Sequence, residues 1–305
     1  MLVGYLVHRA MQAMLILWLL LTLLFFTARL KGDPVAVLVG GQVTATDLDR
    51  LRHAYGLDQP IAKQYEKFLV GVVHLDFGES IRTHQAALPM VMSRLGPTLK
   101  LVIPALVLAV SLAIPIGTIA ASYRGTFLDG AAMVGAVIGQ SVPSFFLGVL
   151  LILVFGVKLR WLPVIGGTII RYLILPVVTL MGYPLARYTR VVRAQVSETM
   201  TADFIRTAHA KGLPFRVVMV RHVLKNALLP VITLVGTDIG LMATAAIIVE
   251  AIFAIPGFGS LFLLSATARD YPVIEASGFV LGVSVLLSSM VVDLSYGFID
   301  PRMRH

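Results

Sequence analysis

Six long stretches of this sequence are free of charge or carry a single aspartate. A helix needs about 20 mainly apolar residues to cross a hydrocarbon core roughly 30 Å thick. The stretches are residues 10–28, 101–123, 130–157, 172–186, 226–249 and 276–299, which contain 19, 23, 28, 15, 24 and 24 residues. The composition agrees, because 58% of the 305 residues are hydrophobic and only 13% are charged. We therefore predict an all-α polytopic membrane protein with six transmembrane helices.

Two features of these stretches complicate simple spanning helices. The fourth stretch holds only 15 residues, so a span there must carry Arg187, Arg190 and Arg193 into the interface by snorkelling. The prolines inside the predicted spans include Pro104, Pro115 and Pro143. Because neighbouring groups can satisfy the backbone atoms that a proline frees, we expect these residues to cause kinks at most.

The first stretch could instead belong to a cleavable signal peptide. Its 19 apolar residues exceed the usual apolar region of a signal peptide, and no small-x-small cleavage site precedes Lys31. We therefore expect an uncleaved first transmembrane helix.

The positive charge is distributed unevenly along the chain. Residues 187–225 carry eight Lys or Arg and two Asp or Glu, which is +6 of the formal net charge of +9. Residues 30–96 carry seven of each sign and are neutral. The positive-inside rule therefore predicts that residues 187–225 are cytoplasmic, that both termini are cytoplasmic, and that residues 30–96 are outside.

Three segments follow from this topology. Residues 1–29 hold the N-terminus and first span, residues 30–96 form an extracytoplasmic insert between the first and second helices, and residues 97–305 form a core with five spans. Within the insert, apolar spacing predicts a helix from Asp47, after Thr46 as a cap, to Gly56. A second helix is predicted to follow Pro60 and to stop near Gly71, and residues 74–83 are expected to form short strands or turns.

Several function classes fit the sequence poorly. The sequence pI near 10.0 could indicate nucleic-acid binding, but no basic stretch is interleaved with stacking aromatics, so we expect no nucleic-acid partner. The chain has no cysteine, which excludes disulfides and thiolate metal sites. His53, His74 and His84 share no i, i+3 or i+4 spacing, so ordinary surface histidines are favoured over metal ligands and no metal is predicted.

The chain also lacks the common catalytic motifs. It has no H-E-x-x-H, no G-x-S-x-G and no G-x-x-x-x-G-K-[ST] sequence, so we expect no zinc hydrolase, serine hydrolase or NTPase. An intramembrane aspartyl protease would need two aspartates at one depth, whereas Asp238 lies mid-span and Asp293 near an end. A charge such as Asp238 costs about 2.5–3.5 kcal/mol at a span centre. Asp238 must therefore border a pathway or bond a neighbouring helix, near Thr237 or Thr244, and both alternatives stay open.

Residues 202–211 interrupt the apolar sequence with a short polar helix. Thr201 is a candidate cap, Asp203 favours the positive helix end, and Lys211 lies at the other end before Gly212 and Pro214. Ten residues give a helix about 15 Å long. Its small apolar patch is predicted from Phe204, Ala208 and Ile205. This patch could contact a partner protein, or the helix could rest on anionic lipid headgroups.

The sequence DFIRTAHAKGL (203–213), followed by RHVLKNALLPVIT (221–233), resembles the cytoplasmic loop of the inner-membrane permease subunits of ABC importers, in their oligopeptide and dipeptide branch. Further resemblances run along the chain, in KGDPV, GLDQPIAKQYEKFL, HLDFGES, PSFFLGVLLILVFGVKLRWLPVIG, EAIFAIPGFGSLFLLSATARDYPVI and VDLSYGFIDPRMR. Lys31 replaces the family's usual proline. Thr207-Ala208 replaces the general Glu-Ala-Ala, and Gly212 is 18 positions from Pro230, a lengthening typical of the peptide branch.

This resemblance implies a permease subunit that forms half of a pathway for di- or oligopeptides in the bacterial inner membrane. Its partners would be a second permease subunit, two ATPase subunits, an extracytoplasmic substrate-binding protein and membrane lipid. The chain would hold no cofactor, since ATP and Mg would bind the ATPase subunits, and it would catalyse nothing itself. Nickel or another small solute is the alternative cargo. A secondary transporter is the alternative class, although no convincing internal repeat is visible.

The resemblance also implies two groups of site residues. In the coupling loop, about residues 197–225, a short helix would insert into a groove on the ATPase, with Phe204 and Ala208 as the buried contact and Gly212 as the stop. The residues of this coupling helix are Asp203, Phe204, Arg206, Thr207, Ala208, His209, Lys211 and Gly212. The candidate external gate consists of Glu250, Phe253, Pro256, Gly257 and Gly259, and its turn is expected because Pro256 cannot continue the fifth helix.

Overall fold

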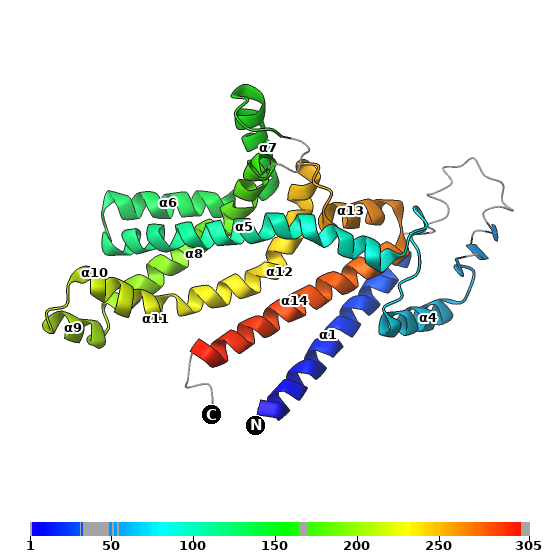
Figure 1. Ribbon diagram of the computed structural model, residues 1–305, viewed down its shortest axis with the longest axis horizontal. Coiled ribbons are helices and arrows are strands. Elements are labelled where there is room, and N and C mark those ends of the chain that lie inside the picture. Colours follow the sequence, from blue (N-terminus) through cyan, green and yellow to red (C-terminus); the bar gives the residue numbers. More distant parts are fainter. Residues whose placement is uncertain are drawn as a thin grey trace. The chain divides into compact units, whose positions relative to one another are not determined.

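The computed structural model describes residues 2–30, 32, 49–50, 52–53, 55–164 and 170–299, with side chains except at 2–7, 10 and 291–299. These residues are almost entirely helical (Figure 1). Among them, the only extended pairing is an isolated antiparallel bridge between Glu79 and Ala86. The predicted all-α class is therefore confirmed.

The described residues form two compact units. One comprises Met1–Thr98 with Pro256–Leu286, and the other comprises Leu99–Ile255 with Leu287–His305. The first unit contains α1 (Leu2–Leu30), α4 (Ile61–His74), the start of α5 (Ala87–Ser122), α13 (Phe258–Ala268) and most of α14 (Tyr271–Ile299). The second contains the rest of α5, then α6 (Phe127–Ser141), α7 (Ser144–Leu151), η1 (Ile152–Lys158), α8 (Arg171–Met200), α9 (Asp203–Ala210), α10 (Phe215–Val217), η2 (Val218–Leu224), α11 (Lys225–Ala227) and α12 (Leu229–Ile252).

The candidate spans agree with most of the apolar stretches. Among the described residues, four helices are long and apolar enough to cross a membrane: Met11–Leu30, Ala87–Ser122, Leu229–Ile252 and Tyr271–Met290. A fifth is obtained if Phe127–Ser141 and Ser144–Lys158 count as one broken span. α8 covers the fourth stretch but also carries arginines on both sides of it, at 171, 187, 190 and 193. The number of six spans therefore stays a prediction.

The third stretch differs from the prediction, because it is not one helix. α6 and the helix that begins at Ser144 are bent by 102° relative to each other. Pro143 disfavours helical backbone at the residue before it, and Val142 is extended at φ −80° and ψ 118°. The expectation of kinks at most was therefore wrong for Pro143, although Pro104 and Pro115 lie inside an unbroken α5.

Residues 30–96, which we predicted to be an extracytoplasmic insert, contain the helix α4 in their described part. α4 follows Pro60 as predicted, but it continues past Gly71 to His74 and ends where Leu75 adopts a left-handed φ of 57°. Phe68 is buried in the core of the first unit with Phe25, Phe77 and other apolar side chains. Of the helix predicted from Asp47 to Gly56, residues 47, 48, 51 and 54 lie outside the described residues, and residues 49–50 and 52–53 are helical.

The segment after α4 is fixed by a buried aspartate. The Ser80 hydroxyl donates to Asp270 Oδ2 at 2.5 Å, and the Ile81 N–H donates to Asp270 Oδ1 at 3.1 Å. The predicted turns of residues 74–83 are therefore held against the segment between α13 and α14. Within the described residues, no cluster of three or more metal-ligating side chains occurs.

Close helix packing in the second unit depends on small residues, as is common in membrane bundles. A Cβ atom at Gly117 of α5 would lie 2.7 Å from Val192 Cβ of α8. A Cβ atom at Gly139 of α6 would lie 2.9 Å from Ala186 Cβ of the same helix α8. α5 and α6 therefore pack closely against α8 at these two glycines.

Candidate functional site

The candidate site begins where α8 ends and α9 follows after two residues. The Thr201 hydroxyl donates back to the Glu198 carbonyl oxygen at 2.7 Å, so it closes α8 and does not cap α9. The residue at the cap position of α9 is Ala202, and no side chain bonds the first turn there. The prediction that Thr201 caps this helix was therefore wrong, while its extent, 203–210, agrees with the predicted 202–211.

α9 is anchored to its own chain by two side chains. Ile205 is 3% exposed and Ala208 is 5% exposed. Both lie in an apolar cluster with residues of α8 and η2, namely Val192, Val196, Val218, Met219 and Val223. Phe204, in contrast, is 47% exposed. The prediction that Phe204 and Ala208 share one face that a partner buries was therefore wrong. Ala208 is buried against α8 and η2 of this chain, whereas Phe204 is exposed on another face of α9.

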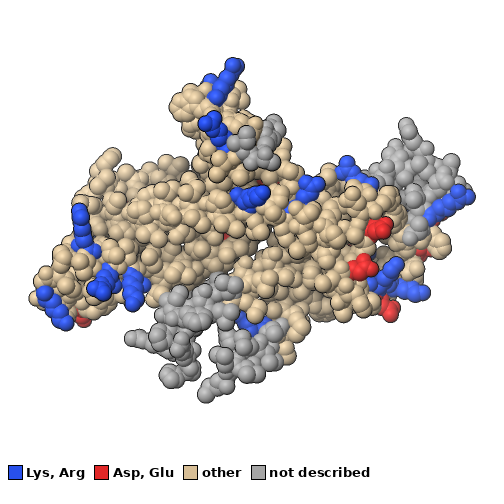
Figure 2. Space-filling view, in the orientation of Figure 1, with Lys and Arg blue, Asp and Glu red and all other residues tan. Residues whose placement is uncertain are grey.

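The opposite face of α9 is polar and exposed, with Phe204 as its large apolar group. The exposed members of the predicted coupling helix are Asp203, Phe204, Arg206, Thr207, His209, Lys211 and Gly212. Figure 2 shows Lys and Arg side chains gathered over the region of α9 to α11. The pair of Arg206 with Asp203 at 3.6 Å is fully on the surface, where such pairs contribute little stability. This basic face with one aromatic side chain is available to a partner.

A glycine turn ends α9 and redirects the chain. The Leu213 N–H bonds the Ala208 carbonyl, and the Gly212 N–H bonds the His209 carbonyl. This pair of bonds is a Schellman motif, which requires left-handed backbone at the first residue after the helix cap, here Gly212. Gly212 has a φ of +77°, and Leu213 packs on the same apolar cluster as Ala208. The stop predicted at Gly212 is thus present in the backbone.

The return from α9 to α12 contains a π-helix that the sequence analysis missed. η2 spans seven residues, Val218–Leu224, between α10 and α11. The wider turn directs Val218, Met219 and Val223 into the cluster that holds α9. π-helical segments are rare and are frequent at functional sites. Nothing in the apolar spacing of these residues distinguishes a π-helix from an α-helix.

Three arginines of α8 bond side chains of neighbouring helices. Arg187 Nη1 donates to Asp238 Oδ1 of α12 at 2.6 Å. Arg193 bonds both carboxylate oxygens of Asp129 in α6 at 2.8 Å. Arg190 Nη1 donates to Gln140 Oε1 of α6 at 2.7 Å. Arg187 and Arg193 are thus held by buried aspartates of neighbouring helices, contrary to the expectation that they snorkel outward, whereas Arg190 is exposed.

Asp238 lies between helices, but its partner is not a threonine. The hydroxyls of Thr237 and Thr244 donate to backbone carbonyls of their own helix, those of Leu234 and Gly240. The structure therefore pairs Asp238 with Arg187, 51 residues away in the sequence. Charged side chains within membrane-spanning segments usually pair with one another. This rule, applied to the arginines that follow the fourth stretch, was the signal that could have identified the contact.

The candidate gate residues fall into two groups. In the second unit, Glu250 is 0% exposed and Phe253 is 1% exposed, and Phe253 packs with residues including Leu175 and Leu180. α12 ends at Ile252, as the following Pro256 led us to expect.

In the first unit, the Pro256 carbonyl accepts from Arg94 Nη1 at 3.1 Å. Gly257 occupies the cap position of α13, and Gly259 is buried in its first turn. The Phe258 N–H donates to the Thr98 hydroxyl at 2.8 Å. The segment therefore continues as a helix that is held to α5.

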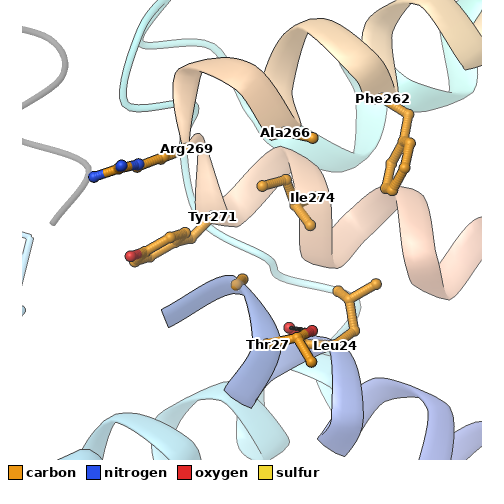
Figure 3. Close-up of a pocket in the computed structure, with 8 residues that line it drawn as sticks. Leu24, Thr27, Phe262, Ala266, Arg269, Tyr271 and Ile274 are labelled. Atoms are coloured by element: carbon orange, nitrogen blue, oxygen red, sulfur yellow. Dashed lines mark hydrogen bonds between the residues drawn. The ribbon is translucent and has the colours of Figure 1, made fainter. Parts of the chain in front are cut away.

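An apolar pocket of about 100 Å³ lies in the first unit, where α1 meets α13 and the start of α14 (Figure 3). Its lining consists of Leu24, Thr27, Ala28, Phe262, Ala266, Arg269, Tyr271 and Ile274. Tyr271 donates its hydroxyl hydrogen to the Gly32 carbonyl at 2.5 Å. None of the predicted site residues lines this pocket, so it is separate from the coupling helix and from the candidate gate.

Comparison with known proteins agrees with this architecture. Residues 113–305 match the family described as binding-protein-dependent transport system inner membrane component, and residues 1–113 match its N-terminal region. The glutathione transport system permease proteins GsiC of Escherichia coli K12 and of Shigella boydii are each 36% identical to this chain over 303 residues, which is 99% of both chains.

A crystal structure of an amino acid ABC transporter with histidines has the same fold, with a TM-score of 0.53 at 18% identity. The match covers 68% of this chain and 92% of that chain. The matches cover the whole chain and agree with its helical, span-rich structure. The chain therefore belongs to the family of inner-membrane components of binding-protein-dependent transport systems, as a multi-pass ABC importer permease and not an enzyme.

Proposed function

We propose that this chain forms half of the translocation pathway for small peptides in an ATP-driven importer. The observation that carries the proposal is the two-faced α9, because one face is fixed to α8 and η2 through Ile205 and Ala208 and the other presents Phe204 among cations. Such an element can transmit a push from a partner to α8. The cargo is inferred from the GsiC relatives, whose name specifies glutathione, a tripeptide.

The partner of the exposed face is proposed to be an ATPase subunit, which binds ATP and Mg²⁺. Protein interfaces concentrate their binding free energy in a few central side chains, with aromatic residues prominent and charges at the rim. Phe204 is suited to the centre of such a contact, with Arg206 and Lys211 at its rim. Two ATPase subunits, a second permease subunit and an extracytoplasmic binding protein would complete the transporter.

The orientation proposed for this assembly places α9 and both termini in the cytoplasm. The support is the charge of +6 in residues 187–225 against a neutral insert at 30–96. The insert, including α4, would then face the binding protein that delivers the cargo.

Uptake assays in a strain that lacks its own peptide and nickel importers test this proposal. The chain would be expressed with the transporter subunits encoded beside it, and uptake of labelled glutathione, a dipeptide, a pentapeptide and Ni²⁺ would be compared. We expect ATP-dependent uptake of at least one peptide. Uptake of Ni²⁺ alone would replace the peptide assignment with the metal alternative.

A pair of aromatic substitutions tests the role of α9 in the same assay. Phe204→Ala is expected to abolish uptake and ATPase copurification without reducing the amount of chain in the membrane. Phe127→Ala is the matched control, since Phe127 is 87% exposed at the start of α6, an end that six spans would place on the same side as α9. Equal loss in both variants, or in neither, would contradict the assigned contact.

A further inference from the structure

Arg190 of α8 carries a positive charge that no carboxylate in the described part of the chain neutralises. Two other arginines of α8 are paired with buried aspartates of α6 and α12. Arg190 Nη1 donates instead to a neutral group, Gln140 Oε1 of α6, at 2.7 Å. Because Arg190 is also exposed, its charge is neither paired nor covered by the described residues.

The Arg190 guanidinium lies far from the end of α6 that the proposed orientation places in the cytoplasm. Side chains of an α-helix tilt toward its N-terminus, which in α8 is at Arg171. Gln140, the partner of Arg190, lies 13 residues after Phe127, the first residue of α6, which is about 20 Å along the helix axis. The contact of Arg190 with Gln140 therefore falls within a hydrocarbon core roughly 30 Å thick.

A charge at this depth does not face lipid. Charged side chains inside a bilayer almost always face the interior of a helical bundle or a water-filled cavity. Snorkelling would extend the side chain toward the headgroups, whereas the bond to Gln140 holds the Arg190 guanidinium away from them. The exposed side of Arg190 therefore borders water or an anionic partner.

Arg190 belongs to an exposed stripe that follows the axis of α8. Tyr183 is 50% exposed, the Arg187 side chain is 29% exposed, and Ala194 is exposed. Steps of four, three and four residues place these positions and Arg190 on one face of the helix. Arg190 bonds α6 and Arg187 bonds α12, so the stripe lies on the side of α8 between these two helices (Figure 1).

We propose that Arg190, with Arg187 beside it, is a carboxylate-binding site on the wall of the translocation pathway. Its ligand is a carboxylate group of a small peptide in transit. Arg190 uses one nitrogen for Gln140, so its two other nitrogens can donate to a carboxylate, the geometry in which arginine binds this group most strongly. Arg187 is engaged by Asp238 and adds positive potential one helical turn away.

This inference rests on the proposed function, because its ligand is the proposed cargo. Glutathione carries two carboxylates and one ammonium group near neutral pH, so its net charge is opposite to that of the stripe. An acidic side chain of the second permease subunit is the competing partner for Arg190. A single ion pair would need one position, whereas the stripe extends over about three helical turns, as a path along the helix requires.

Water-accessible cysteines test the position of the site without any cargo. The chain has no cysteine of its own, so Gln140→Cys and Ile138→Cys can be compared in the complete transporter in proteoliposomes. Between these two positions Gly139 faces Ala186 of α8, so they lie at similar depth on opposite edges of that contact. Ile138 is 57% exposed and is the matched control, expected to face lipid.

The reagent is a charged methanethiosulfonate added to both sides of the membrane. It reacts with the thiolate, which forms where water reaches the side chain. Gln140→Cys is expected to react roughly tenfold faster than Ile138→Cys or more. Equal rates would overturn the pathway position of Arg190.

Charge substitutions at Arg190 test the ligand in the same proteoliposomes, supplied with the binding protein and labelled glutathione. Arg190→Gln removes the charge, so glutathione transported per ATP hydrolysed should fall roughly tenfold or more. Arg190→Lys keeps the charge as a point donor and should stay within about threefold of wild type. Equal loss in both variants would overturn the inference, because it indicates a shape requirement and not a charge requirement, and so would loss in neither.

The remaining outcomes separate the inference from the proposed function. Loss of the second permease subunit from purified Arg190→Gln would overturn the pathway site in favour of an ion pair between subunits. Slow labelling of Gln140→Cys in a transporter that imports glutathione would overturn the inference and leave the proposed function intact. Fast labelling of Gln140→Cys without peptide transport by the wild type would refute the proposed cargo and, with it, the peptide ligand.

Discussion

The anchoring of α9 by Ile205 leads to a quantitative prediction. Ile205→Ala removes three carbon atoms from a side chain that is 3% exposed. At about 0.8 kcal/mol per buried methylene the transfer loss is about 2.4 kcal/mol, and the cavity left behind raises the cost to about 3 kcal/mol. The lost contact joins α9 to α8 and η2, so the cost falls on local undocking of α9. The undocked fraction should therefore rise roughly 100-fold.

Hydrogen–deuterium exchange of the chain in lipid nanodiscs measures this undocking, because local opening exposes the amide hydrogens of α9. Ile205→Ala should speed exchange of these amides roughly 100-fold, while amides at the centre of α12 keep their rates. Phe204→Ala is the matched control, since Phe204 is exposed and should change exchange little. Equal acceleration in both variants would refute the helical phase described here, as would no acceleration in Ile205→Ala.

Three further substitutions test other contacts. Gly212→Val places a branched side chain at φ +77°, which should cost about 1–2 kcal/mol and lower glutathione uptake, with Gly212→Asn milder. Gly117→Leu would overlap Val192, 2.7 Å from the added Cβ, and should lower stability by about 1–3 kcal/mol, seen as a lower melting temperature in detergent. Asp270→Ala removes the acceptor of the Ser80 hydroxyl hydrogen and of the Ile81 N–H and should cost about 1–3 kcal/mol in the same assay. An unchanged melting temperature in either of these two variants would contradict its contact.

Features that depend on local physics were predictable from the sequence. The apolar stretches 10–28, 101–123, 226–249 and 276–299 lie within or largely within α1, α5, α12 and α14, because a bilayer sets the minimum length of such a stretch. The start of α4 after Pro60 and the stop at Gly212 follow from the backbone limits of proline and glycine. These expectations needed no knowledge of neighbouring helices.

Features that depend on neighbouring elements were not predictable in the same way. Ala208 has Phe204 at i−4 and Ile205 at i−3, so either pairing makes a continuous helical face. Ile205 is the residue buried with Ala208 because the apolar side chains of α8 and η2 lie against that face. The π-helical geometry of η2 that directs these side chains cannot be recognised from residue spacing. The cost of burying Asp238 predicted that a partner was needed but did not identify Arg187. Likewise, Pro143 indicated a departure from a straight helix but did not predict the 102° bend between α6 and the helix that begins at Ser144.

The uninterrupted course of α8 has a mechanical consequence. Its Arg193 is clamped to Asp129 of α6 through two hydrogen bonds, seven residues before the helix ends at Met200 and six residues after Arg187. At 1.5 Å per residue, these arms are about 10 Å and about 9 Å long. If the clamp serves as a fulcrum, sideways motion at the α9 end is delivered to Arg187 with nearly equal amplitude and opposite direction. Because the two lengths are nearly equal, the displacement at Arg187, and so at α12, would be almost as large as the displacement imposed on α9.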